Sequence, residues 1–291
     1  MKIIDTTTFF EEKMMMEIRF NILNSYVDNF IVAESTFTHT GRKKKINFNP
    51  NDYPNFKNKI IHLVQDKEPE NIIRNVNNDN SIIRNNSIQR IIHQRNFIQE
   101  SLKIFDQDDY IIHSDNDEIP NLKDIDFVKN KNDIIIFKQK LFYFKFNLSL
   151  LNVTWFGSKA CKIKNLKSIS WLRNVKNKKY NNFRIDTIFS KNKYKSVKLI
   201  DNGGWHFSNL KTADDLVRKY LNDENYAHYL NQNYSIDKIK DDINNKTIGY
   251  NHSANSRSEE RFSKTKLSNI NEEDLPNYLK NNKEKYREWF D

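Results

Sequence analysis

The sequence predicts an α/β protein with a mostly parallel central sheet and helices on both faces. In the first half of the chain, short apolar runs alternate with helical patterns, the arrangement that gives parallel strands joined by crossover helices. A chain of 291 residues with 37% hydrophobic content can bury a sizeable core. We therefore predict a single domain over residues 1–291, with a helical elaboration at its C-terminal end.

The first half follows from apolar spacing. Apolar residues at helical steps predict a helix over about 12–27. A second helix is expected at about 87–105, with Ser87 as its N-cap. Short apolar runs predict strands at 2–5, 30–33, 59–64 and 110–113.

The second half has a different pattern, with long β-prone stretches before the helices return. Asparagine- and lysine-rich stretches at 74–86, 174–182 and 244–258 are expected to be surface loops. Helices are expected at 212–221 and 275–290. The β-prone stretches are 133–146, 153–157 and 195–200, the last of which leads into residues 201–207.

Charge and cysteine content narrow the possible environments and partners. The net charge of +10 suits nucleic acid, an anionic membrane surface or phosphorylated small molecules, and does not choose between them. A single cysteine, Cys161, cannot form an intrachain disulfide and indicates a reducing compartment. No apolar run is long enough to cross a bilayer. We expect a soluble, cytoplasmic protein without a membrane span.

An acidic segment at 114–120 is the main candidate for chemistry. Asp115 and Asp117 follow an apolar strand and lie two positions apart, so both carboxylates can face one cation in extended backbone. Oxygen ligands of this kind suit Mg²⁺ or Mn²⁺, and ligands of open α/β sheets bind beyond the carboxyl ends of strands. The alternative is an acidic turn in which an aspartate caps the next helix and Pro120 helps to start it.

Arg95 gives an independent indication of an anionic site. It falls on the apolar stripe of the helix expected at 87–105, the stripe that faces the core. A buried arginine needs an anionic partner, or its stem must reach solvent. That partner is either a structural carboxylate or a bound phosphate.

The sequence Gly203-Gly204-Trp205-His206-Phe207 is the third candidate feature. Paired glycines permit a close backbone approach that fixes the place of the Trp and His. His206 is either a ligand of a metal or phosphate, or a hydrogen-bonded structural residue. A position of His206 near Asp117 would favour the metal.

Together these segments resemble glycosyltransferase family 17, the family of the β-1,4-mannosyl-glycoprotein 4-β-N-acetylglucosaminyltransferases. The similarity spans nearly the whole chain, and its blocks occur in the family's order. The blocks are residues 5–10 with 16–20, 27–35 with Thr38 and Gly41, 94–96 before 114–120, Phe142 and Tyr143, Trp155 and Gly157, 204–208, and 275–279 with Asn282 and Tyr286.

The resemblance implies a GT-A-like fold with a Rossmann-like sheet, a UDP-sugar donor (UDP-GlcNAc above all), Mn²⁺ or Mg²⁺, and inversion at the anomeric carbon. Residues 1–128 would form the nucleotide-sugar half and 129–291 the acceptor-side half. The expected metal ligands are Asp115, Asp117 and His206. The expected donor contacts are Glu34, Arg95, Asp115 and Trp205. The expected general base is Glu118 or Glu224, with Asp223 a weaker candidate.

Two departures from the family pattern affect the acceptor. Animal members carry an N-terminal membrane segment that this sequence does not show, and residues 220–225 lack an expected Ser-His pair. A microbial or viral polysaccharide, or a glycoprotein glycan assembled in a cytoplasm, is therefore the expected acceptor.

Two other functions compete with transfer. The first is a basic protein that binds nucleic acid or an anionic surface, supported by the net charge of +10 and by the basic loops at 42–45 and 176–180. No nucleic-acid-binding motif occurs at a recognisable spacing, so we expect no nucleic-acid partner. The second is a metal-dependent phosphohydrolase that uses the same carboxylates.

Overall fold

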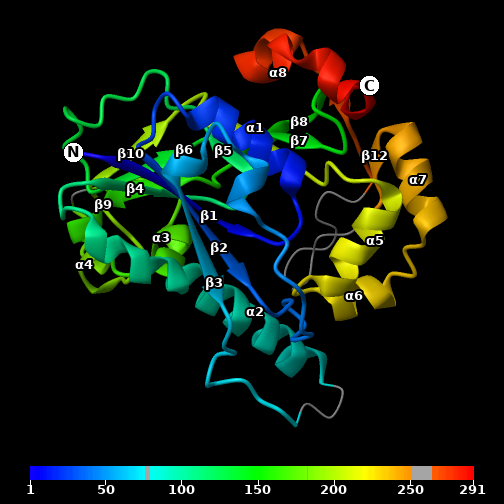
Figure 1. The fold of residues 1–291 in the computed structure, drawn as a ribbon, viewed down its shortest axis with the longest axis horizontal. Coiled ribbons are helices and arrows are strands. Elements are labelled where there is room, and N and C mark those ends of the chain that lie inside the picture. The colour runs from blue at the N-terminus through cyan, green and yellow to red at the C-terminus, as the bar shows by residue number, and fades with distance from the viewer. Residues whose placement is uncertain (76–78, 182, 251–263) are drawn as a thin grey trace.

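The computed structural model describes residues 1–75, 79–181, 183–250 and 264–291, which form a mixed α/β structure (Figure 1). A seven-stranded sheet has the order β10-β6-β9-β4-β1-β2-β3, and a five-stranded sheet has the order β14-β8-β7-β11-β5. A small sheet pairs β12 (Thr247–Ile248) with β13 (Thr265–Lys266). The α/β class predicted from the sequence is confirmed.

The seven-stranded sheet is mostly parallel. β9 is antiparallel to β4 and to β6, and all other neighbouring pairs are parallel. Residues before and after position 128 both contribute strands to this sheet. The division of the chain into a nucleotide-sugar half and an acceptor half stays a prediction, and so does the GT-A-like arrangement. The strands are β1 (Ile3–Phe9), β2 (Asn29–Ser35), β3 (Ile60–Gln65), β4 (Tyr110–His113), β6 (Ile134–Phe137), β9 (Lys159–Lys162) and β10 (Val197–Ile200).

The five-stranded sheet is mostly antiparallel. Sequence patterns did not predict it as a sheet distinct from the seven-stranded one. The β-prone stretch at 133–146 splits into β6, in the larger sheet, and β7, in the smaller one. β11 pairs parallel with β7 and antiparallel with β5, which sets His206 opposite Glu118. The strands are β5 (Glu118–Pro120), β7 (Gln139–Tyr143), β8 (Leu148–Trp155), β11 (Gly204–Ser208) and β14 (Ser268–Asn269).

Helices cover both faces of the seven-stranded sheet because alternate side chains of its strands point to opposite sides. Phe30 and Val32 of β2 lie in one core cluster with residues of α1, while Ile31 and Ala33 lie in another with residues of α3. The α-helices are α1 (Lys13–Leu23), α2 (Asn80–Phe97), α3 (Ile169–Asn174), α4 (Asp186–Phe189), α5 (Ala213–Asn222), α6 (Tyr226–Asn231), α7 (Ile236–Asn245) and α8 (Asn277–Asn281).

Two helix boundaries differ from the prediction. α2 begins at Asn80, because the side chain of Asp79 accepts hydrogen bonds from the backbone N–H groups of Ser81 and Ile82. Ser87 therefore lies within the helix, where its hydroxyl donates to the Ile83 carbonyl. The expected C-terminal helix is interrupted, with α8 followed by a 3₁₀ segment at Lys283–Trp289.

Parts of the three expected loops lie outside the described residues, namely 76–78, 182 and 251–258. No helix in the described ranges has both the length and the apolar character needed to span a membrane.

Candidate functional site

A cavity of about 340 Å³ lies beside the ends of β1 and β4, with α2 and the segment after α5 contributing to its walls. The acidic segment contributes to its lining. Seven residues expected at the site from the sequence line this one cavity: Arg95, Asp115, Asp117, Glu118, His206, Asp223 and Glu224.

Arg19 fixes the backbone of the acidic segment from inside the core. Its side chain is fully buried. Nε and Nη2 donate to the two carboxylate oxygens of Asp5 at 2.7 and 2.6 Å, and Nη2 also donates to Ser114 Oγ at 2.7 Å. Nη1 donates to the carbonyl oxygens of Asp115 and Glu118, at 3.2 and 2.8 Å. All five guanidinium N–H groups thus have an acceptor, and two of those acceptors define the turn that carries the carboxylates.

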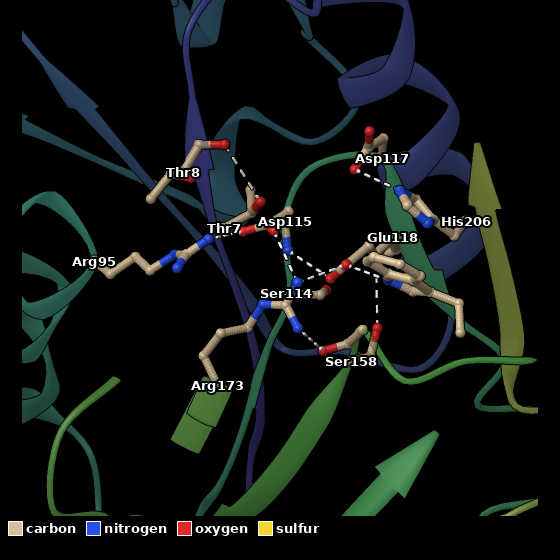
Figure 2. A network of polar contacts seen from close by, with 12 residues as sticks. Thr7, Thr8, Arg95, Ser114, Asp115, Asp117, Glu118, Ser158, Arg173 and His206 are labelled. Atoms are coloured by element: carbon tan, nitrogen blue, oxygen red, sulfur yellow. Dashed lines mark hydrogen bonds and ion pairs between the residues drawn. The ribbon is translucent and has the colours of Figure 1, made fainter. Parts of the chain in front are cut away.

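Asp115 is held by two arginines (Figure 2). Arg95 Nη2 donates to Oδ1 at 2.7 Å, and Arg173 Nη2 donates to Oδ2 at 3.0 Å. Burial opposes ionisation of this carboxyl, but the two arginines outweigh it and hold its pKa well below the usual range. Arg95 thus has a structural carboxylate partner. Its Nε is buried and has no hydrogen-bond partner among the described residues.

Glu118 is buried and its two oxygens are already bonded. Oε1 accepts from Trp155 Nε1 at 2.6 Å and from Arg173 Nη2 at 2.8 Å, while Oε2 accepts from the Asp115 backbone N–H at 3.0 Å. Burial raises its pKa, and the charge of Asp115 adds to this while Arg173 opposes it. A Cβ at Gly157 would lie 2.3 Å from Glu118 Cδ, so only glycine leaves room for this side chain.

Asp117 and His206 approach each other at the cavity. His206 Nε2 lies 3.6 Å from Asp117 Oδ1 (Figure 2). The pairing of β11 with β5 causes this approach, and the Phe207 N–H donates to the Asp117 carbonyl at 2.8 Å. Burial opposes ionisation of Asp117, but His206 and Lys219 outweigh it and lower the pKa. His206 Nδ1 is buried, with no hydrogen-bond partner in the described part of the chain.

Glu224 reaches the same cavity from the segment between α5 and α6. Burial, followed by the negative charge of Asp223, raises its pKa to about 7. Within the described residues it forms no hydrogen bond or ion pair. Its carboxylate is therefore available to a ligand, unlike that of Glu118.

The comparison with protein families decides the identity. The family model of glycosyltransferase family 17 matches residues 1–290. The chain belongs to this family. It is therefore a glycosyltransferase, which uses a nucleotide-sugar donor and an acceptor.

This family 17 enzyme was also compared with solved structures and with curated proteins. Two solved structures of HddC from Yersinia pseudotuberculosis, one complexed with GMP-PN, are 10% identical to it, with TM-scores of 0.30 and 0.29. Each match covers 69% of this chain and 90% of the HddC chain. No curated protein matches the enzyme.

Two residues expected to contact the donor in this family 17 enzyme do not line the cavity. Glu34 accepts hydrogen bonds from the backbone N–H groups of Asn47 and Phe48 at 2.8 and 2.9 Å, and from Lys44 Nζ. Trp205 donates to the Asp274 carbonyl at 2.7 Å and lines a separate cavity of about 530 Å³. Successive strand residues point to opposite faces, so His206 and Trp205 cannot both reach one cavity.

The glycosyltransferase has two side chains that fit a divalent cation. No group of three or more His, Cys, Asp or Glu side chains able to hold a metal occurs within the described ranges. Asp117 Oδ1 and His206 Nε2 nevertheless lie 3.6 Å apart at one cavity wall, so a carboxylate and an imidazole can face one ion. Mg²⁺-like ions are commonly held by one or two protein ligands plus water and phosphate. Asp115 fits less well, because arginines occupy both of its oxygens.

Sequence reasoning missed Arg19 and Arg173 as site residues of the enzyme. Arg19 was detectable, since it lies three residues after Met16 and four before Leu23 on the apolar stripe of α1, the same signal that singled out Arg95. Arg173 was not, because it comes from α3, 58 residues after Asp115, and no local pattern predicts that contact.

Proposed function

We propose that this glycosyltransferase transfers GlcNAc from UDP-GlcNAc to a glycan acceptor, with a divalent cation and with inversion at the anomeric carbon. The observation that supports this most is the meeting of Asp117, His206 and Glu224 at one cavity. These side chains come from three different segments, namely the acidic segment, β11 and the stretch after α5, and together would supply a cation site and a base.

Asp117 and His206 would hold Mn²⁺ or Mg²⁺. The ion, when bound, would neutralise the diphosphate and stabilise the charge that develops on it as the bond to the sugar breaks. Arg95 lines the same cavity, and its unpartnered Nε is a further donor for the diphosphate.

Glu224 serves as the general base in this proposal. The acceptor hydroxyl oxygen forms a bond to the anomeric carbon while the bond from that carbon to the UDP oxygen breaks, and the hydroxyl proton passes to the Glu224 carboxylate. A base works best when its pKa lies near the operating pH, and that of Glu224 is about 7. Glu118, the other candidate, already accepts three hydrogen bonds and is better suited to holding Arg173 and Trp155 in place.

The acceptor and the compartment are proposed from sequence features alone. We propose a polysaccharide or glycoprotein glycan in a cytoplasm as the acceptor. We do not propose the alternative function, a basic nucleic-acid-binding protein without catalysis, because residues 1–290 match a family of enzymes.

A transfer assay tests the proposal. The enzyme is incubated with UDP-GlcNAc, UDP-glucose or UDP-galactose, a panel of oligosaccharides, and either Mn²⁺ or EDTA. We expect GlcNAc transfer only with metal, and NMR of the product should show a β-linkage from the α-linked donor. Asp117→Asn should abolish transfer, while Asp241→Asn, at an exposed aspartate of α7, should not. Release of free sugar without acceptor, at the rate of transfer, would instead indicate a hydrolase.

A further inference from the structure

Residues 176–195, here called the basic segment, connect α3 to β10 and contain α4. They hold seven lysines and arginines against one aspartate, a net charge of +6, compared with +10 for the whole chain. α4 lies at the edge of the molecule, on the opposite side of the view from α5, α6 and α7 (Figure 1). None of its described residues lines the cavity at the acidic segment.

Three large apolar side chains of the basic segment are turned to solvent. Phe183 is 91% exposed, Phe189 85% and Ile185 69%. The two phenylalanines are the most exposed large apolar side chains in the described part of the chain. Single exposed apolar residues are ordinary, but a group within seven positions is a feature of surfaces that bind an apolar partner.

The base of the segment is tied down, so these side chains project from a fixed platform. The Lys176 N–H donates to the Asn192 carbonyl at 2.8 Å, which closes the segment. Trp171 Nε1, on α3, donates to the Lys191 carbonyl at 2.7 Å.

The one acidic residue of the segment, Asp186, is already neutralised. Arg184 Nε and Lys193 Nζ both lie 2.8 Å from its carboxylate oxygens. Lys179 and Lys191 are exposed and form no ion pair within the described residues. The surface around the exposed apolar group is therefore strongly positive.

We infer that the basic segment docks the enzyme on an anionic lipid bilayer. Lysine and arginine are attracted to the phosphates of anionic headgroups, and apolar side chains enter the boundary between headgroups and acyl chains. Ile185 favours a bilayer over single-stranded nucleic acid, because bases stack on aromatic rings and gain nothing from an aliphatic chain.

Docking of this segment also bears on the catalytic centre. Arg173, which bonds to Asp115 and Glu118, lies three residues before the basic segment. Lys159 Nζ donates to the carbonyls of Arg173 and Val175, at 2.7 and 2.6 Å, and so fixes the end of α3 to the sheet. The bilayer-binding segment is thus connected to Asp115 and Glu118 through residues 173–175, which Lys159 holds against the sheet.

Vesicle sedimentation tests the inference without using transfer activity, so its outcome is independent of the proposed function. The full chain is mixed with vesicles of phosphatidylcholine alone or with phosphatidylserine added. The apolar variant is Phe183→Ser with Phe189→Ser, and its control is Ile104→Ser with Val128→Ser, which are 70% and 81% exposed elsewhere. The charge variant is Lys179→Gln with Lys191→Gln, and its control is Lys43→Gln with Lys45→Gln, all four being exposed.

We expect binding to the phosphatidylserine vesicles and not to phosphatidylcholine alone, weakened by salt. The apolar and charge variants should each lower the partition coefficient at least tenfold, and the controls should not. Absence of vesicle binding, or binding that the apolar variant retains, would overturn the inference. So would preferential binding of a single-stranded oligonucleotide that the same variants abolish, since this would assign the segment to nucleic acid.

Discussion

Arg19 and Asp5 form a fully buried ion pair, with N···O distances of 2.7 and 2.6 Å, directly beneath the acidic segment. The pair joins α1 to β1, and the remaining N–H groups of Arg19 hold the turn from Ser114 to Glu118. A core contact therefore determines where the site carboxylates lie.

Removing Arg19 should destabilise the protein strongly. Arg19→Met leaves the Asp5 carboxylate buried without its partner, which costs on the order of 3–5 kcal/mol. Denaturant unfolding measures this free energy. The control is Lys103→Met, which removes an exposed pair with Glu100 and should change stability by no more than about 1 kcal/mol. Equal effects of the two substitutions would show that Arg19 is not a core support.

Gly157 should not tolerate a larger residue. In Gly157→Ala the new Cβ meets Glu118 Cδ and Gln139 Oε1, at 2.3 and 2.6 Å in the present geometry, so Glu118 must move. We expect a loss of roughly 1–3 kcal/mol in unfolding free energy, as for other overpacked sites, together with reduced transfer. Asn177→Ala, at an exposed position, serves as the control. Unchanged stability and activity in Gly157→Ala would contradict the placement of Glu118.

The pH dependence of transfer should report Glu224. The base acts when deprotonated, so kcat/KM should rise with pH and level off above about 7, the pKa to which burial and Asp223 raise this carboxyl. Asp223→Asn removes the like charge and should shift that rise to lower pH. Asp241→Asn should leave it in place.

Substitution of the base itself gives a second test. Glu224→Gln should lower kcat by about 10²- to 10⁴-fold with little change in UDP affinity. A variant with wild-type kcat, or a pH profile that Asp223→Asn does not move, would assign the base elsewhere.

Local patterns predicted the α/β class and the acidic segment that lines the cavity, because strands and the polar residues that follow them are adjacent in sequence. They could not predict which face of β11 meets the cavity: alternation separates Trp205 from His206 but does not say which of them turns inward. The contact of Arg173 with Asp115 depends on where α3 packs, which is a tertiary property. The start of α2 was placed too late because Asp79 lies in an asparagine-rich stretch that was interpreted as a loop.

Calorimetric titration of UDP in the presence and absence of Mn²⁺ measures whether Asp117 and His206 hold the cation that binds the donor diphosphate. We expect wild-type enzyme to bind UDP more tightly with Mn²⁺. Asp117→Ala and His206→Ala should each weaken this binding by at least about tenfold while the proteins stay folded, and Asp241→Ala should not. UDP binding that is indifferent to Mn²⁺, or that is unchanged in Asp117→Ala, would contradict this cation site.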